Sequence, residues 1–180
     1  SLDISKAEYE AQVQALDSSE KELLDGEKQY QDAYDSTMQI FTQKEQAIAE
    51  NTKYLQNQKA EMVKQQTELQ NQIAVLEAKE SETGLTEEEQ VMLTGLRTSL
   101  ESVNMGIAQL DSGLAELEAG EKELLSQREA FLQKGTEIEQ GKQQIAAGRE
   151  ALNAVKAQLD EGQRQIDEAW STLKEKKNKS

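Results

Sequence analysis

The sequence predicts an all-α protein: a long two-helix antiparallel coiled-coil hairpin with its tip near Gly84. Apolar residues recur at seven-residue intervals along most of the chain, which is the pattern of a coiled-coil seam. The 180 residues include no proline, so no residue of that kind interrupts a long helix. One break near the middle carries helix-stop and helix-start residues. Because the loop there is short, the second helix must return antiparallel to the first.

Composition excludes several other classes of protein. Hydrophobic residues make up 36% of the chain, and the mean hydropathy is −0.81. This is too little apolar material for a globular core, yet the pattern is too periodic for a disordered chain. A formal net charge of −15 disfavours nucleic acids and anionic membrane surfaces as partners. Because no run of about 18 apolar residues occurs, we expect no direct membrane insertion by this segment.

The first helix is expected over residues 5–82. Ser5 and Glu8 fit a capping box, so residues 2–4 should enter as extended chain. The alternative is a helix that starts at the first residue. Two apolar seams follow one another, and the step of four residues between them equals the distance from a d position to the next a position. The heptad frame is therefore expected to continue unbroken. The seams run through Leu2, Tyr9, Leu16, Leu23 and Tyr30, and then through Tyr34, Phe41, Ile48, Leu55, Met62, Leu69 and Leu76.

The turn is expected at residues 83–86 and the second helix at about 87–176. Gly84 suits the left-handed conformation that ends a helix. Thr86 and Glu89 form a second capping box that starts the next helix. Each helix would span roughly 110–130 Å at 1.5 Å per residue, and both termini would lie together at the end opposite the tip.

The second helix carries the most regular repeat of the chain. An apolar residue occurs at every seventh position from Leu96 to Leu173. Six glycines follow members of this row by three residues. Since a glycine inside a helix costs about 1 kcal/mol relative to alanine, this regularity indicates a structural requirement. The six are Gly106, Gly113, Gly120, Gly141, Gly148 and Gly162.

A hairpin centred on Gly84 pairs residues whose numbers total about 168. In the half near the tip, this register places Met62, Leu55 and Ile48 opposite glycines. In the other half it places Glu27 and Glu20 opposite Gly141 and Gly148, and Lys6 opposite Gly162. There the glycines either make room for long charged side chains or add flexibility, and the sequence does not separate these two explanations.

The second helix also has a candidate partner-binding surface near the tip, where a second apolar row lies beside the first. Either the first helix leans across and buries most of this surface, or an exposed stripe binds another helix, from a second copy or from a partner protein. The surface consists of Leu96, Leu100, Val103, Ile107, Leu110, Leu114 and Leu117.

No residue is predicted to be catalytic, to bind a cofactor or to bind a metal, and we expect the chain not to be an enzyme. It contains no histidine and no cysteine, which removes the usual zinc ligands and thiol nucleophiles. The carboxylates are spread over solvated helix faces without a calcium-loop spacing. Trp170, close to several lysines at the end of the chain, is either a contact to a host domain or an ordinary residue beside the seam.

Two segments carry a resemblance to a known family. Residues 110–124 (LDSGLAELEAGEKEL) and 138–148 (IEQGKQQIAAG) resemble repeats in the extracellular coiled-coil insertions of FtsX-like (MacB-type) ABC transporter permeases of Gram-positive bacteria. The resemblance implies an extracellular, cell-surface location and a non-catalytic stalk that presents a binding surface and relays conformational change. It also implies a host permease domain at the base. Residues 1–180 would then be a single elongated hairpin, and a fragment of a larger membrane protein.

Two other classes fit the same pattern. One is the hairpin of a periplasmic adaptor (membrane-fusion) protein of an efflux system, although residues 79–90 lack the arginine typical of adaptor tips. The other is a structural coiled coil that associates with itself. A flanking lipoyl-like β domain would favour the adaptor, flanking membrane spans would favour the permease, and neither would favour the third class.

Overall fold

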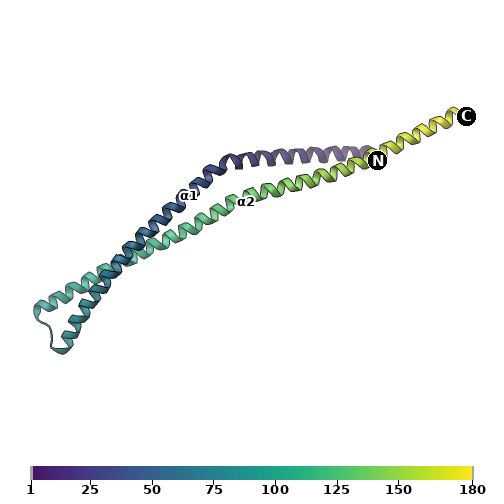
Figure 1. The fold of residues 1–180 in the computed structure, drawn as a ribbon. Helices are drawn as coiled ribbons and strands as arrows, with labels where there is room; N and C mark the ends of the chain where they lie inside the picture. Colours follow the sequence, from purple (N-terminus) through teal and green to yellow (C-terminus); the bar gives the residue numbers. More distant parts are fainter. Residues whose placement is uncertain (1, 180) are drawn as a thin grey trace. The chain divides into compact units, whose positions relative to one another are not determined.

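The computed structural model describes residues 2–179, with side chains from residue 5 onward. It contains two α-helices, α1 over Leu2–Glu82 and α2 over Glu87–Lys179 (Figure 1). The helices pack against each other in antiparallel directions, and the described residues include no strand. The predicted all-α helical hairpin is confirmed.

The outer ends of both helices extend further than the sequence indicated. α1 is already helical at Leu2, so the prediction of extended chain before a cap at Ser5 is wrong. A capping side chain stabilises a helix start by only about 1 kcal/mol. That is too little to stop a helix whose preceding residues can also form helical hydrogen bonds. α2 continues to Lys179, three residues past the expected end.

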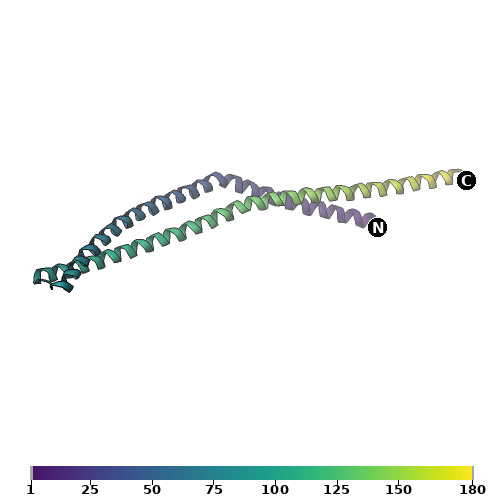
Figure 2. The same cartoon turned by 60° about the horizontal axis from the view of Figure 1, so that its bottom comes forward.

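Figure 2 shows the turn that joins the two helices. Its hydrogen bonds are those that the sequence predicted. Gly84 has a φ of +80°, and its N–H donates to the Lys79 carbonyl oxygen at 3.2 Å. This left-handed residue satisfies a carbonyl group at the end of α1. The Thr86 N–H donates to Glu89 Oε1 at 3.0 Å, and the Glu89 N–H donates to Thr86 Oγ1 at 3.2 Å. These reciprocal bonds are the predicted capping box, and they fix the first turn of α2.

The capping box gives a testable pH dependence. The hydrogen bond from Lys79, followed by the Thr86 N–H, lowers the pKa of Glu89. A carboxyl with a lowered pKa stabilises the fold above its unfolded-state pKa, and this stabilisation is lost as the pH falls through the folded-state value. We therefore expect Glu89→Gln to lower the melting temperature near neutral pH and to converge with the unsubstituted protein in acid. Glu88→Gln removes a neighbouring charge without these bonds, and should show a smaller difference across the same pH series.

The chain divides into two compact units. We call Thr37–Arg128, which includes the turn, the tip unit, and Ser1–Ser36 with Glu129–Ser180 the base unit. In the tip unit the buried apolar residues come from both helices, and Leu93 is only 2% exposed. The buried residues of this unit are Phe41, Ile73, Leu93 and Leu124.

The tip unit has the predicted register. A Cβ atom placed on Gly106 would lie 2.8 Å from Sδ of Met62. On Gly113 it would lie 3.1 Å from Cδ1 of Leu55, and Ile48 approaches Gly120 in the same way at 4.0 Å. The residue numbers of each pair total 168, which is the predicted register. Because the α2 member of each pair is a glycine, the large side chains of α1 pack directly onto the backbone of α2. Glycine there permits this close approach.

The base unit has a different register, and the sequence prediction for it is wrong. Gly141 faces Leu23, whose Cδ1 would lie 2.9 Å from an added Cβ, and Gly148 faces Leu16 at 3.2 Å. These numbers total 164, four less than in the tip unit. Gly141 and Gly148 therefore have the same role as the tip glycines, since each receives a leucine. The partner that this register gives Gly162 is Leu2, whose side chain lies outside the described part of the chain.

The two registers show that the heptad frame of α1 is interrupted. Leu16 and Leu23 belong to the first seam, whereas Leu55 and Met62 belong to the second, yet both seams contact the same glycine row of α2. The step from Tyr30 to Tyr34 is thus an insertion of four residues, called a stutter. The prediction of an unbroken frame is wrong because α2, whose seven-residue row continues without a step, has no matching insertion.

Ion pairs of one heptad position of α2, four residues after the apolar row, show the same change of register; pairs at other positions have other totals. In the tip unit Arg128 contacts Glu45 at 2.9 Å, a pair whose numbers total 173. In the base unit Lys142 contacts Glu27, and Arg149 contacts Glu20 at 3.0 Å, with totals of 169. The difference is again four residues.

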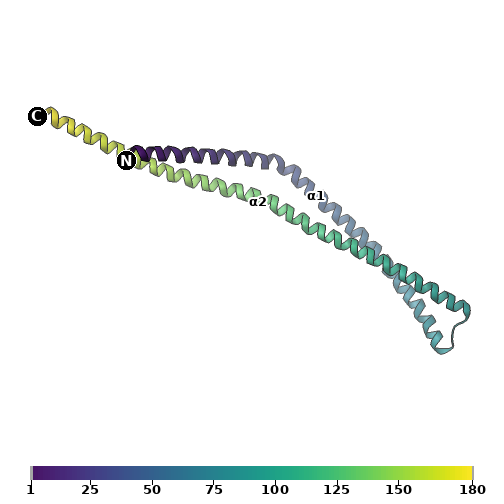
Figure 3. The same cartoon turned by 180° about the vertical axis from the view of Figure 1, so that it is seen from behind.

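Within the base unit, α2 runs past the start of α1. Figures 1 and 3 show the final turns of α2 continuing beyond the N-terminal end of α1. Lys6 Nζ donates to Gln163 Oε1 at 3.3 Å, and residues 164–179 are all exposed. The prediction that both termini lie together is therefore wrong. The shifted register and the greater length of α2, 93 residues against 81, account for the difference.

Candidate interaction surfaces

The predicted partner-binding surface near the tip is half-buried in this structure. Its seven members all lie between the buried and the fully exposed classes, so α1 covers part of each side chain. None is among the large exposed hydrophobic residues. The role of this surface in binding a partner stays a prediction. Its members are Leu96, Leu100, Val103, Ile107, Leu110, Leu114 and Leu117.

Other apolar side chains of the tip unit are more accessible. Val91 is 73% exposed, Val75 is 70% exposed and Tyr54 is 61% exposed. They were not selected from the sequence because they lie outside the seven-residue rows that contact the opposite helix. Scattered single apolar residues of this kind are normal on a protein surface.

An aromatic cluster lies in the base unit beside the four-residue step of α1. The Tyr30 and Phe131 ring centroids are 4.9 Å apart, and Tyr34 lies 6.0 Å from Phe131 in a stacked arrangement. Tyr30 and Tyr34 also meet edge-on at 5.8 Å. Aromatic pairs at such distances add about 0.5–1.5 kcal/mol beyond the area that they bury. The cluster therefore stabilises the position at which α1 changes register.

Gly135 allows Tyr30 to lie against α2. A Cβ atom at Gly135 would lie 2.8 Å from the Tyr30 hydroxyl oxygen and 2.9 Å from Cζ. Gly135 was not predicted from the sequence, because it lies one residue after the position at which the glycine row would continue. Its spacing from Tyr30 along the sequence could have indicated this contact. The two residues face one another only in the base register, however, and that register was not predicted.

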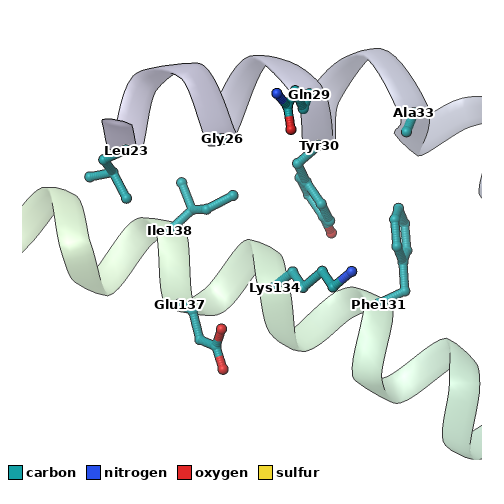
Figure 4. A pocket seen from close by; sticks show the side chains of 9 residues that line it. All are labelled: Leu23, Gly26, Gln29, Tyr30, Ala33, Phe131, Lys134, Glu137 and Ile138. Atoms are coloured by element: carbon teal, nitrogen blue, oxygen red, sulfur yellow. The ribbon is translucent and has the colours of Figure 1, made fainter. Parts of the chain in front are cut away.

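A groove of about 470 Å³ runs beside this cluster. Figure 4 shows Tyr30 of α1 pointing toward α2, and Phe131 and Ile138 of α2 pointing toward α1, while Glu137 points away. The groove offers apolar rings with a lysine near them. It is lined by Leu23, Gly26, Gln29, Tyr30, Ala33, Phe131, Lys134, Glu137 and Ile138.

Cations of α2 in the base unit pair with carboxylates of α1. The hydrogen bond to Glu27 raises the pKa of Lys142. The bonds to Glu20 and then Asp17 raise the pKa of Arg149, whose Nη2 lies 2.9 Å from Asp17 Oδ1. Both groups stay charged at neutral pH. Because exposed ion pairs contribute little to stability, these contacts mark the register of the base unit more than they stabilise it.

No group of three or more histidine, cysteine, aspartate or glutamate side chains in the described part of the chain is placed to hold a metal ion. Neither helix, over the residues that the structure describes, is both long and apolar enough to cross a membrane.

Comparisons with known proteins gave no match. No protein-family model matches the chain, and the searches of curated proteins and of solved structures found no similar protein.

Proposed function

We propose that this chain is a non-catalytic, extracellular stalk and binding module of an FtsX-like (MacB-type) ABC transporter permease. It would present an interaction surface and relay conformational change to the permease. The resemblance of residues 110–124 and 138–148 to the repeats of that family supports the proposal. The same resemblance supports a cell-surface location and a host permease domain as partner.

One structural observation carries the mechanical part of the proposal. In each unit, side chains of α1 pack directly onto glycine backbone of α2, as Leu55 does at Gly113 and Leu16 does at Gly148. Such close contacts, repeated every seven residues, hold the two helices at short distance and resist sliding of one along the other. A stalk that relays movement needs this resistance, because a pair of helices that slides freely would absorb the movement.

The proposal is tested by labelling the parent protein on living cells. The chain has no cysteine, so Ser81→Cys places one new thiol in it, at the exposed end of α1. We expect a membrane-impermeant maleimide to label Ser81→Cys on intact Gram-positive cells, and the labelled protein to remain in the membrane fraction. Leu93→Cys, at a position only 2% exposed, is the matched control and should stay unlabelled until the protein is unfolded.

Each alternative location gives a different labelling result. If the native host instead has an outer membrane, labelling only after that membrane is permeabilised would indicate a periplasmic adaptor. Labelling only after cell lysis would indicate a cytosolic structural coiled coil. Either result contradicts the stalk proposal.

A further inference from the structure

Two more cavities continue the groove beside Tyr30 along one side of the base unit. Their volumes are about 320 and 420 Å³. The smaller one shares Leu23 with the 470 Å³ cavity, and it shares Leu16 and Ser19 with the 420 Å³ cavity. The three therefore form one continuous groove, which we call the base groove. It follows residues 12–33 of α1 and 131–155 of α2, so both helices are present along its whole length.

The opposite side of the same seam is occupied by ion pairs. Gly141 and Gly148, which line the base groove, follow the apolar row of α2 by three residues. Lys142 and Arg149 follow that row by four residues and pair with carboxylates of α1. Because a helical turn has 3.6 residues, positions three and four residues away lie on either side of the starting residue. The glycines and the cations therefore lie on opposite sides of the seam, and the groove is on the glycine side.

The groove is continuous with the interface between α1 and α2. Among the side chains that the structure describes, no member of the base unit is buried, whereas the tip unit has four buried residues. Leu23, Ile145 and Leu152 belong to the seam and also line the groove, and all three are half-buried. Because helices are stabilised mainly by burying an apolar face, this side of the seam is suited to further helix packing.

The groove is electrically neutral in a chain whose net charge is −15. Of the residues that line the three cavities, only Lys134 and Glu137 are charged, and their charges cancel. Two copies of an acidic chain repel each other over most of their surfaces, so they approach most easily through a neutral face. The walls are also small, which permits close packing of helices. The small wall residues are Ala15, Ser19, Gly26, Ala33, Gly141, Gly148 and Ala151.

We propose that two copies of this chain associate through their base grooves and form a four-helix bundle. α1 of each copy packs antiparallel against α2 of the other, and one two-fold axis runs along the bundle. With the copies level, Ser19 meets Gly148 of the second copy, and Ala15 meets Ala151. The residue numbers of these pairs total 167 and 166, close to the total of 164 in the base register. The inference uses only the base unit and does not depend on the proposed function.

The same arrangement separates the carboxylates of the two copies. In the row that contains Ala15 and Ala151, Glu137 meets Gln29 of the second copy. Glu22, which lies seven residues from Ala15 in that row, meets Gln144. Each carboxylate therefore faces an amide that can donate a hydrogen bond to it, and no carboxylate faces another.

Sedimentation equilibrium of the whole chain, from micromolar to millimolar concentration, tests the association. We expect a reversible equilibrium between monomer and dimer. Ala151→Glu places a charge in the contact with Ala15 of the second copy, and should raise the dissociation constant about tenfold or more. Ala154→Glu adds the same charge at a residue that lines none of the three cavities, and should leave the dissociation constant unchanged. Circular dichroism should show the same helicity for both variants.

Disulfide formation between copies tests their arrangement, because the chain has no cysteine. A mixture of Ala15→Cys chains with Ala151→Cys chains should give a disulfide-linked dimer under mild oxidation, since these residues meet across the groove. Neither variant alone should do so. A mixture of Ser18→Cys with Ala154→Cys is the matched control, because both residues lie outside the groove, and it should stay unlinked.

Four outcomes would overturn this proposal. A chain that stays monomeric at millimolar concentration has no such contact. Equal effects of Ala151→Glu and Ala154→Glu would show that general charge repulsion, and not the groove, controls association. Efficient linking of Ala15→Cys chains to each other would show a different arrangement of the copies. Protection of Ser19→Cys, but not Ser18→Cys, from a maleimide in a monomeric longer form of the chain would show that the chain covers its own groove.

Discussion

Deletion of residues 31–34 from α1 should leave the protein at least as stable as the full chain, whereas deletion of residues 31–33 should destabilise the base unit by more than about 3 kcal/mol. The first deletion removes the four inserted residues. It leaves Tyr30 and Phe41 seven positions apart, which is the spacing of the rest of the seam. α1 then has the same uninterrupted repeat as α2, and one register serves both units. The loss of Tyr34 and its contact with Phe131 costs about 1 kcal/mol.

The three-residue deletion differs by a single residue but changes the phase of the helix. One residue corresponds to about 100° of rotation about the axis of an α-helix. The half of α1 before the deletion is then turned so that Leu16 and Leu23 no longer face Gly148 and Gly141. Each of these leucines loses about 1–2 kcal/mol of apolar burial, and the Tyr30 contact with Phe131 is lost as well.

Urea unfolding followed by far-UV circular dichroism measures both deletions against the full chain. We expect one transition at equal or higher urea for the four-residue deletion. For the three-residue deletion we expect an early loss of part of the helical signal. Equal stability of the two deletion variants would contradict the stutter and the two registers inferred from it.

The hairpin, its turn and the register of the tip unit could all be predicted from the sequence, because each depends on local chemistry. Gly84 ends α1, and the Thr86–Glu89 capping box starts α2, so the turn fixes which residues face each other nearby. The contacts of Met62 and Leu55 with glycines follow from that anchor.

The register of the base unit could not be predicted in the same way. The two core positions of a heptad are three and four residues apart, so in a single helix a stutter of four residues looks the same as a change from one core position to the other. The step from Tyr30 to Tyr34 was visible but ambiguous. The missing constraint lay in the other helix. At the total of 173 that Arg128 and Glu45 have in the tip unit, Lys142 and Arg149 would face Gln31 and Leu24, and a shift of four residues gives them Glu27 and Glu20 instead.

Substitution of a glycine by alanine should raise the free energy of unfolding where an added Cβ atom meets no neighbour. It should lower this free energy where the Cβ atom would clash with a rigid side chain. A Cβ atom on Gly26 or Gly95 would meet no atom within 4 Å. Alanine at either position should therefore raise the free energy of unfolding by about 1 kcal/mol, through helix propensity and a less flexible unfolded chain. At Gly106 the added carbon meets the end of the flexible Met62 side chain, which can move aside, so the two effects should nearly cancel.

Gly135 should show the largest loss among these positions. Its added Cβ would lie 2.8–3.0 Å from three atoms of the Tyr30 side chain, a rigid ring that cannot bend away. The ring must leave α2, and with it the contact with Phe131. We expect Gly135→Ala to destabilise the protein by about 1 kcal/mol despite the gain in propensity, and Gly135→Leu by about 3 kcal/mol, in the range of overpacked interiors.

A double-mutant cycle separates the ring clash from other effects of changing Gly135. In a Tyr30→Ala background the obstructing ring is absent, so Gly135→Ala should become stabilising, like Gly26→Ala. The coupling between the two positions should amount to about 2 kcal/mol, the difference between a loss of about 1 and a gain of about 1. If Gly135→Ala instead stabilises the unsubstituted chain as much as Gly26→Ala does, then Tyr30 does not rest on α2 at Gly135, and the base register is not the one described. The substitution thus tests with one methyl group the same four-residue shift that the deletions test with a whole helical turn.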